Sequence, residues 1–314
     1  MSYDARIIAD SVGPNGARVT TFELTMPRIV LAEHNTHRMY SRNAASSRAI
    51  PVEKLLARVE EDPMLPAWWG KNQSGMQAEG ELSDAVDDAV WNVRSGSSPR
   101  SRARDEWLRL RDAAVQGARN LVGIGLHKQI SNRVVEPWMF TTVVCTATEW
   151  SNGFALRVDP AAQPEYERTM RMALEARERS RPRVLASGEW HLPYVDFESE
   201  PELHDARWTP LDYCLISAGR CAAVSYLNQG KRDPEGDVAR ANRIRDAGHM
   251  SPFEHQCRAM TAEEWTQYGL RAAAAWVDQR VPVGNVWGFH QFRKELADEH
   301  DYSKIKARQG QRPA

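Results

Sequence analysis

The segment from His34 to Ile50 carries the densest set of anion-binding side chains in this sequence. Its arginines and short hydroxyl side chains are Arg38, Ser41, Arg42, Ser46, Ser47 and Arg48. Guanidinium forks and hydroxyl groups are the groups with which proteins hold phosphate oxygens. A charge run is more often a solvated surface, but the apolar residues 28–32 anchor this segment, and solubility alone does not explain so many hydroxyls. We therefore interpret the segment as a site for a nucleotide phosphate.

A second polar cluster, HMSPFEH, lies at residues 249–255, far away in sequence. It offers His249, Ser251, Glu254 and His255 around a rigid Pro-Phe step. Histidine and carboxylate can bind a metal, but the spacing is not HExxH and no further ligand cluster is evident. The plain alternative is a helix that ends at Gly248, followed by a turn. We interpret the cluster as a polar loop that binds a cofactor, and we expect no metal site.

Two isolated arginines stand beside apolar residues. Arg133 lies in NRVVEP (132–137), and Arg157 lies in WSNGFALRVDPAAQPE (150–165). An arginine in such a setting either pairs with a carboxylate or binds a ligand. The alternative for the second segment is an ordinary loop that leads into a helix. The residues by themselves leave both readings open.

The sequence shows no arrangement typical of a catalytic nucleophile. Cys257 follows His255 by two residues, but proximity in sequence is not triad geometry, and a small buried apolar side chain is the better interpretation. Neither GxGxxG nor GxxxxGK[ST] occurs, so ordinary dinucleotide-binding and P-loop folds are not expected.

Composition excludes several classes of protein. The 314 residues include 41 Lys and Arg against 42 Asp and Glu, a net charge of −1, whereas a duplex-binding protein usually has a basic excess. The four cysteines form no CxxC pair, so we expect free thiols in a reducing compartment. No apolar run has the length of a membrane span, and the N-terminus does not resemble a signal peptide. We expect a cytoplasmic protein that binds neither membranes nor duplex nucleic acid.

The periodicity predicts an α+β protein with a small, mostly antiparallel sheet and long helices. Residues 17–26 alternate as a strand does, and a helix is predicted to follow from Pro27, with Arg38 and Arg42 on one face. The segment 135–154 is ambiguous between helix and strand. Further helices are predicted at 52–62, 103–129, 163–180, 211–227, 237–248 and 262–279.

The organisation expected is a single domain over residues 1–314. Residues 63–100, rich in Gly, Ser, Pro and Trp, are predicted to form an irregular insertion. Residues 181–209 hold several prolines and tryptophans and are predicted to form a long loop. No tandem repeat or linker is evident.

Taken together, these segments resemble the flavin-dependent thymidylate synthases. The family signature is Arg-His-Arg followed by seven residues and Ser; this chain has Thr36, His37, Arg38 and then Ser46, with Arg48 beyond it. The strand-Pro-helix pattern that precedes the signature is also similar. Four more segments resemble family blocks: 132–137, 150–165, 220–226 and the HxSPFEH loop at 249–255.

The sequence also departs from the family pattern. Thr36 replaces the first signature arginine, and Ala44 and Ala161 stand where the family often has an acidic residue and a histidine. The SPFEH loop follows the signature by about two hundred residues, whereas in the family it precedes it. Residues 284–296, which include Gln291, resemble the Gln-x-x-Arg approach to the signature. The order therefore indicates a permuted or partly duplicated relative, of a phage-type branch.

The resemblance implies a flavin-dependent thymidylate synthase-like fold and a homotetramer. It implies transfer of one carbon from methylenetetrahydrofolate to C5 of a pyrimidine nucleotide, dUMP or dCMP, with FAD as cofactor and NADPH as reductant. Arg133 and Arg157 would be catalytic, because they would stabilise the negative charge that develops on the ring carbonyl. Substrate would be bound by Ser46, Ser47, Arg48, Arg133, Arg157 and Gln291. The flavin would be bound by His37, Arg38, Asn152, Ser225, Ser251 and Glu254.

Three alternatives remain open from the sequence. Addition of water in place of hydride would give a dUMP or dCMP hydroxymethylase, of the kind used in phage base modification. The chain could be a non-catalytic nucleotide-binding relative. A weaker third alternative is a metal-dependent hydrolase that uses His249, Glu254 and His255.

Overall fold

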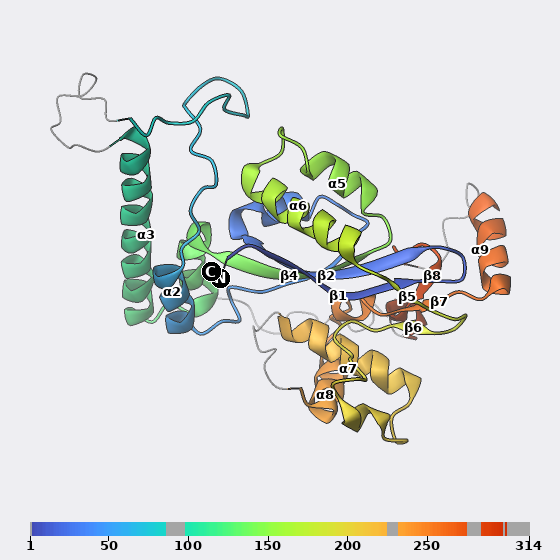
Figure 1. Ribbon diagram of the computed structural model, residues 1–314. Helices are drawn as coiled ribbons and strands as arrows, with labels where there is room; N and C mark the ends of the chain where they lie inside the picture. Colours follow the sequence, from blue (N-terminus) through green and yellow to red (C-terminus); the bar gives the residue numbers. More distant parts are fainter. Residues whose placement is uncertain (1, 86–97, 225–231, 275–283, 298, 300–314) are drawn as a thin grey trace.

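A computed structural model describes residues 2–85, 98–224, 232–274, 284–297 and 299, and shows an α+β protein (Figure 1). The larger sheet has five strands in the order β3-β4-β2-β1-β5, with antiparallel pairing except between β1 and β5. The prediction of a mostly antiparallel sheet is therefore confirmed. Its strands are β1 (Asp4–Val12), β2 (Arg18–Pro27), β3 (Ser41–Ala44), β4 (Phe140–Ala147) and β5 (Arg183–Val184).

The upper face of this sheet is apolar because alternate residues of β2 point to it. Phe22 and Leu24 are fully buried there, opposite Cys145 and Val143 of β4. Two helices, α5 (Ser151–Arg157) and α6 (Pro164–Arg179), cover this face (Figure 1). They complete the main core with Trp150, Tyr166, Met170 and Ala173.

The lower face of the same sheet is polar and also covered. A three-stranded antiparallel sheet, α7 (Pro210–Ala223) and α8 (Pro234–Asp246) lie below it (Figure 1). The small sheet consists of β6 (Trp190–His191), β7 (Cys257–Ala259) and β8 (Phe289–Gln291). Two short 3-10 helices flank it, η5 (Ser251–Glu254) and η6 (Phe292–Glu295), and α9 (Ala262–Ala274) lies beyond β7.

A chain of buried hydrogen bonds joins the two sheets. His191 contacts Ser11 (2.9 Å) and Thr21 (2.8 Å), and Thr21 contacts Thr146 at 2.7 Å. Thr146 in turn contacts Nδ1 of His255 at 2.9 Å. Burial lowers the pKa of both histidines to about 3, so they are neutral at pH 7. Because these side chains satisfy most of one another's hydrogen bonds, a polar sheet face can serve as an interior surface; Nε2 of His255 is the exception, buried without a partner among the described residues.

A helical cluster stands at one end of the sheet (Figure 1). It consists of α2 (Val52–Glu61), α3 (Pro99–Gly123), α4 (Lys128–Ser131) and η2 (Asn132–Trp138), around a second core that includes Leu55, Leu56 and Trp138. Of the insertion predicted at 63–100, residues 86–97 lie outside the described residues; residues 63–85 form no named helix or strand and have an isolated bridge between Gly70 and Glu81. Buried Glu165 of α6 accepts a hydrogen bond from the backbone N–H of Ala67 (2.7 Å) and so ties this segment to the main body.

The helix predicted from Pro27 to residue 40 is wrong. A 3-10 turn, η1 (Arg28–Val30), and one helical turn, α1 (Leu31–His34), are followed by strand β3. Arg42 therefore lies in an edge strand, paired with Cys145, and shares no helix face with Arg38. Pairing with a strand a hundred residues later overrides the local helical pattern.

Other boundaries differ in smaller ways. The helix predicted at 103–129 begins at Pro99 and ends at Gly123, two residues before Gly125, whose φ of +96° ends the run. The ambiguous segment contains η2, β4 and α5. The loop predicted at 181–209 includes β5, β6 and η3 (Pro201–His204). Within the described residues no helix is both long and apolar enough to cross a membrane.

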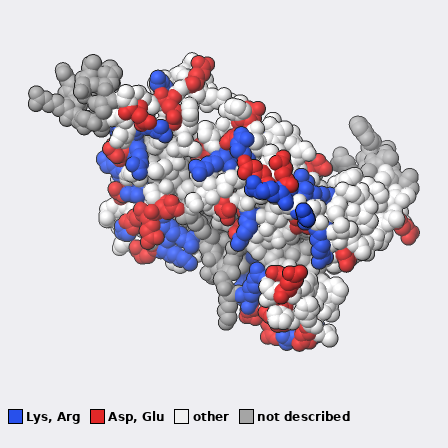
Figure 2. All heavy atoms as spheres, viewed as in Figure 1, with Lys and Arg blue, Asp and Glu red and all other residues white. Residues whose placement is uncertain are grey.

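Charges are mixed on the surface. Figure 2 shows basic and acidic side chains intermingled over the helices of the visible face. This pattern agrees with the net charge of −1.

Candidate functional site

An open, polar hollow of about 440 Å³ lies beside edge strand β3. This volume lies in the usual range for small-molecule sites. Three stretches far apart in the sequence supply its walls: 38–42, η5 and 284–294. The residues that line it are Arg38, Tyr40, Arg42, Glu254, Gly284, Asn285, Gln291, Arg293 and Lys294. The structure thus brings together Arg38, Glu254 and Gln291, three of the residues predicted from the sequence.

Gln291 ties the three walls to one another. Its side chain is 2% exposed, and Nε2 lies 3.0 Å from Oγ of Ser41, 2.8 Å from the carbonyl oxygen of Glu254 and 2.8 Å from Oδ1 of Asn285. Ser41 also donates to Oδ1 of Asn285 (2.9 Å). Gly284 makes this approach possible: its φ is +81°, and a Cβ there would collide with Oε1 of Gln291. Gln291 therefore holds the three walls of the hollow together.

The hollow carries an excess of positive charge. Its cationic side chains are Arg38, Arg42, Arg293 and Lys294. Arg293 pairs with the lining carboxylate of Glu254, and both Arg293 and Lys294 pair with Glu299, so Arg38 and Arg42 carry the excess. Arg42 donates to the carbonyl oxygen of His37 (2.7 Å). Arg38 is exposed and makes no hydrogen bond or ion pair with any residue that the structure describes. Unneutralised guanidinium groups beside a concave surface favour an anionic ligand.

A second, less polar hollow of about 320 Å³ adjoins the first. It shares Gly284 and Asn285 with it and is also lined by Met39, Tyr268 and Trp287. Met39 and Trp287 are 45% and 42% exposed, which is unusual for large apolar side chains. The pair of hollows therefore offers a cationic part and an aromatic part side by side.

Arg157 and His37 contact each other next to the basic hollow. Nε of Arg157 donates to Nε2 of His37 (3.1 Å), and Nη1 of Arg157 donates to Glu33 (3.1 Å). Burial and then the charge of Arg157 lower the pKa of His37, so its ring is neutral and Nε2 can accept. The ring of His37 stacks on that of Tyr40, with centroids 5.2 Å apart. Tyr40 thus separates the Arg157–His37 pair from the hollow that it lines.

Tyr40 depends on a glycine in α5. A Cβ at Gly153 would collide with the hydroxyl oxygen of Tyr40. That hydroxyl is buried and has no hydrogen-bond partner among the described residues, and burial raises its pKa far above the usual value. The glycine in the sequence SNGF is therefore required for the aromatic wall of the site.

Ser47 and Arg133 both contact Glu136, outside the lining of the hollow. Oγ of Ser47 donates to Glu136 (2.6 Å), and Arg133 lies 3.5 Å from the same carboxylate. Arg133 is exposed and neither residue lines the hollow. The expectation that Arg133 shares a pocket with Gln291 is therefore not met in a single chain, because Glu136, three residues along the same 3-10 helix, holds it.

Hydrogen bonds from a buried asparagine hold the backbone of the loop at residues 45–50. Asn132 donates to the carbonyl oxygens of Ser47 (2.7 Å) and Ile50 (3.0 Å). Ser46 is half-buried and Arg48 is exposed, and within the described part of the chain neither side chain is hydrogen-bonded. The loop therefore has a fixed backbone and two free polar side chains.

The remaining predicted residues lie apart from both hollows. Asn152 is exposed on α5, and Ser251 is half-buried at the start of η5. Ser225 falls outside the described residues. The predicted metal alternative does not assemble, since His255 is buried against Thr146 and Glu254 pairs with Arg293. Within the described ranges no group of three His, Cys, Asp or Glu side chains could hold a metal ion.

None of the cysteines is an accessible nucleophile. All four are buried, and burial raises the pKa of each thiol well above its ordinary value. The interpretation of Cys257 as a small buried side chain is confirmed.

Several lining residues were missed as site residues from the sequence. Tyr40, Asn285 and Trp287 carry no motif, and Arg293 and Lys294 look like ordinary surface cations. The two glycines in 284–288 were an available signal, because paired glycines around aromatic residues indicate a close backbone approach.

Comparison with known protein families and with curated proteins finds no match to this chain.

Proposed function

We propose that this protein transfers a one-carbon unit from methylenetetrahydrofolate to C5 of a pyrimidine deoxynucleoside monophosphate, with FAD as cofactor. The observation that carries the proposal is the meeting of Arg38, Glu254 and Gln291 at one basic hollow. These residues come from the signature-like segment, the SPFEH loop and the segment 284–296, all of which resemble flavin-dependent thymidylate synthases. The proposal includes a permuted form of that family's fold and a homotetramer.

The paired hollows fit a flavin dinucleotide. Arg38 and Arg42 suit a diphosphate, and Trp287 and Met39 offer apolar surface for a ring system. When bound, the flavin would supply the hydride chemistry of the reaction. The buried thiols support a route that needs no cysteine nucleophile.

Arg157 is the residue to which we assign stabilisation of the pyrimidine. Negative charge must develop on the ring carbonyl as C5 attacks, and a fixed guanidinium stabilises that charge better than water does. Glu33, neutral His37 and the ring of Tyr166 hold Arg157 in place. His37, which Arg157 contacts, stacks on the Tyr40 wall of the hollow, so a substrate ring bound on the Arg157 side of that wall would lie next to the flavin site.

The test is mass spectrometry of products from dUMP and from dCMP, each supplied with methylenetetrahydrofolate, FAD and NADPH. A gain of CH2 identifies a methyl product, and a gain of CH2O identifies the hydroxymethyl alternative. The Arg157→Ala variant should retain flavin and lose turnover, whereas Arg104→Met, a change at an exposed arginine on α3, should leave both unchanged. Absence of both flavin binding and turnover in the wild-type protein would refute the proposal.

A further inference from the structure

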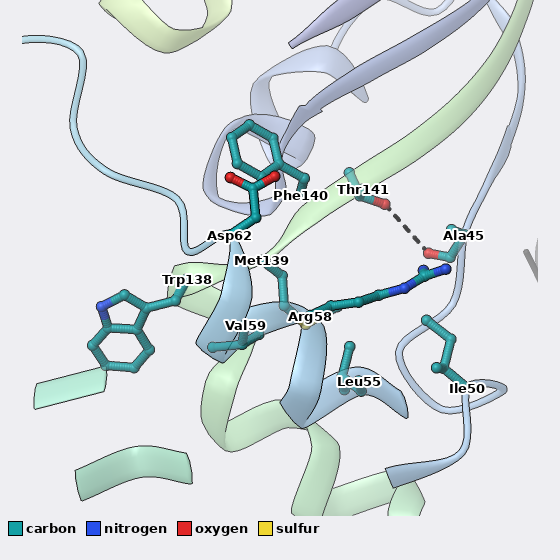
Figure 3. Close-up of a pocket in the computed structure, with 10 residues that line it drawn as sticks. All are labelled: Ala45, Ile50, Leu55, Arg58, Val59, Asp62, Trp138, Met139, Phe140 and Thr141. Atoms are coloured by element: carbon teal, nitrogen blue, oxygen red, sulfur yellow. Dashed lines mark hydrogen bonds between the residues drawn. The ribbon is translucent and has the colours of Figure 1, made fainter. Parts of the chain in front are cut away.

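The second hollow, which adjoins the basic one and is called the aromatic hollow below, is lined by Met39, Tyr268 and Trp287 among others. Its volume of about 320 Å³ is large enough for a small organic molecule. By contrast, the apolar pocket between α2 and the start of β4 has a volume of about 30 Å³ and holds about one water molecule (Figure 3). Of these two spaces, only the aromatic hollow can take an organic ligand.

Aromatic side chains pack against one another at the aromatic hollow. Trp265 and Tyr268 of α9 stack with ring centroids 5.6 Å apart, and Trp265 meets Trp287 edge to face at 4.8 Å. Trp265 thereby supports both of the rings that line the hollow, and Trp287 keeps 42% of its surface exposed. The face of an aromatic ring is negative and attracts cations, most strongly in tryptophan. The rings of Tyr268 and Trp287 therefore offer a surface that attracts a cation.

Hydrogen bonds fix the backbone around the lining residues. The backbone N–H of Trp287 donates to Oγ1 of Thr148 (3.0 Å), the residue before Glu149. Nδ2 of Asn285 donates to the carbonyl oxygen of Met39 (3.3 Å). The segment that carries Trp287 is thus attached both to the end of β4 and to the segment before β3.

Glu149 is the one charged side chain among the described residues that line the aromatic hollow. It is exposed and makes no hydrogen bond or ion pair with any residue that the structure describes. Burial lowers the pKa of Arg177 and the charge of Glu149 offsets part of this shift, yet the two side chains form no ion pair. The negative charge of Glu149 is therefore available to a ligand, whereas the adjoining hollow is basic.

The aromatic hollow offers few hydrogen-bonding groups. Both ends of the Asn285 amide are engaged, Oδ1 with Ser41 (2.9 Å) and Gln291 (2.8 Å) and Nδ2 with a backbone carbonyl. The other polar side chains in the described lining are those of Glu149 and Tyr268. A primary ammonium group has three N–H donors to satisfy, whereas a fully methylated one has none. The lining therefore favours a methylated ammonium over a primary amine.

We propose that the aromatic hollow binds an organic cation with a methylated ammonium group, held by the rings of Tyr268 and Trp287 and by the charge of Glu149. Aromatic rings are the groups with which proteins recognise quaternary ammonium ligands. This binding site depends on the lining of the hollow alone and is separate from the proposed reaction. A flavin ring placed against Met39 and Trp287 would cover the same surface, so the cation and FAD should compete.

The experiment is an NMR titration of the purified full chain with choline, followed through the methyl signal of the ligand at low ionic strength, where charge pairing is least screened. The comparison ligand is the neutral carbon isostere of choline, in which a tert-butyl group replaces the trimethylammonium group. We expect choline to bind more tightly than this isostere. Trp287→Leu should weaken choline binding by about 2- to 30-fold, and Glu149→Gln should weaken it by about 2- to 5-fold.

Matched controls are Trp68→Leu and Glu61→Gln. Trp68 is 43% exposed and lies in the segment 63–85, and Glu61 is an exposed carboxylate at the end of α2. Neither residue lines the hollow, so both variants should bind choline as the wild type does.

Three results would overturn the proposal: no binding of choline to the wild type at millimolar concentration, equal binding of choline and its neutral isostere, or unchanged choline binding in both Trp287→Leu and Glu149→Gln. Displacement of choline by FAD supports the placement of the cation in the aromatic hollow. If choline binds as expected while FAD neither binds nor supports turnover, this site stands and the proposed function fails.

Discussion

Arginine occurs in two contrasting settings in this molecule. Arg220 of α7 is 6% exposed and donates to Glu200 (2.9 and 2.6 Å) and Asp237 (2.8 Å). Arg38, beside the sheet edge, has no carboxylate partner among the described residues. A buried charge with complete pairing fixes the geometry of the chain around it. A cation without a partner at a concave edge is free to bind an external anion, so the two settings separate fold from function.

The largest expected effect concerns the paired arginine. Arg220→Ala leaves Glu200 and Asp237 with only the more exposed Arg232 and Arg240 as partners, and we expect it to lower the free energy of unfolding by up to about 3–5 kcal/mol. Urea denaturation monitored by circular dichroism measures this change. Arg207→Ala, which breaks the exposed pair with Glu235, should cost less than about 1 kcal/mol. Equal losses in the two variants would contradict the contrast.

Substitution of the unpaired Arg38 should affect ligand binding and leave stability almost unchanged. Arg38→Met removes a cation from the basic hollow, and we expect FAD affinity to fall by about 10- to 100-fold. The free energy of unfolding should change by less than about 0.5 kcal/mol, because Arg38 is exposed and no hydrogen bond or ion pair within the described residues is lost. Fluorescence titration with FAD and urea denaturation measure the two quantities. A destabilised variant that binds FAD normally would reverse the assignment.

The wall of the hollow can be tested with a matched pair of glycines. Gly284 and Gly16 have φ of +81° and +78°, but an added Cβ would collide with Gln291 in the first and would meet nothing within 4 Å in the second. Gly16→Ala should cost about 1 kcal/mol from backbone strain alone. Gly284→Ala should cost about 1–3 kcal/mol more from overpacking. Denaturation midpoints of the two variants give the comparison, and equal midpoints would remove the role assigned to Gly284 in shaping the hollow.

The last comparison concerns the buried histidines, whose effect on stability depends on pH. The pKa values of His34, His191 and His255 are lowered to about 3 by burial, whereas the unfolded chain titrates near 6.5. The unfolded state therefore binds more protons as pH falls below 6.5, and stability drops by up to about 1.4 kcal/mol per pH unit for each histidine. Urea denaturation at pH 7.5 and 5.5 measures this slope.

The control for the histidine prediction is a pair of glutamine variants. His255→Gln removes one buried titrating group and should reduce the dependence of stability on pH. His249→Gln changes an exposed histidine and should leave that dependence as it is in the wild type. If stability depended on pH equally in all three proteins, the lowered pKa of buried His255 would not contribute to that dependence, and the prediction would be wrong.

Local patterns predicted much of the fold. The alternation in residues 17–26 marks β2, and the helical periods of α2, α6 and α7 are visible in the sequence. Strand β3 could not be predicted in the same way, because it exists through pairing with β4 about a hundred residues later. The polar lower face of the sheet was also hidden, since its partners are histidines supplied by β6 and the end of η5.

The sequence was enough to predict which segments form the site, but not which residues contact one another there. The signature-like stretch and the SPFEH loop do meet, through Arg38 and Glu254. The partner of Arg133 is Glu136, a spacing of three that sequence alone offers as an ion pair. The role of Gln291 depends on distances across the fold, which no local pattern encodes.

The pairing of β2 with β4 has a consequence for folding during synthesis on the ribosome. Roughly 110 residues separate the end of β2 from the start of β4. At about 5–20 residues per second, β2 is synthesised about 6 to 22 seconds before β4, the strand with which it pairs. During that interval the nascent hairpin of β1 and β2 exposes an unpaired apolar edge, a template for aggregation. We expect soluble yield in a foreign host to follow chaperone supply more closely than final stability.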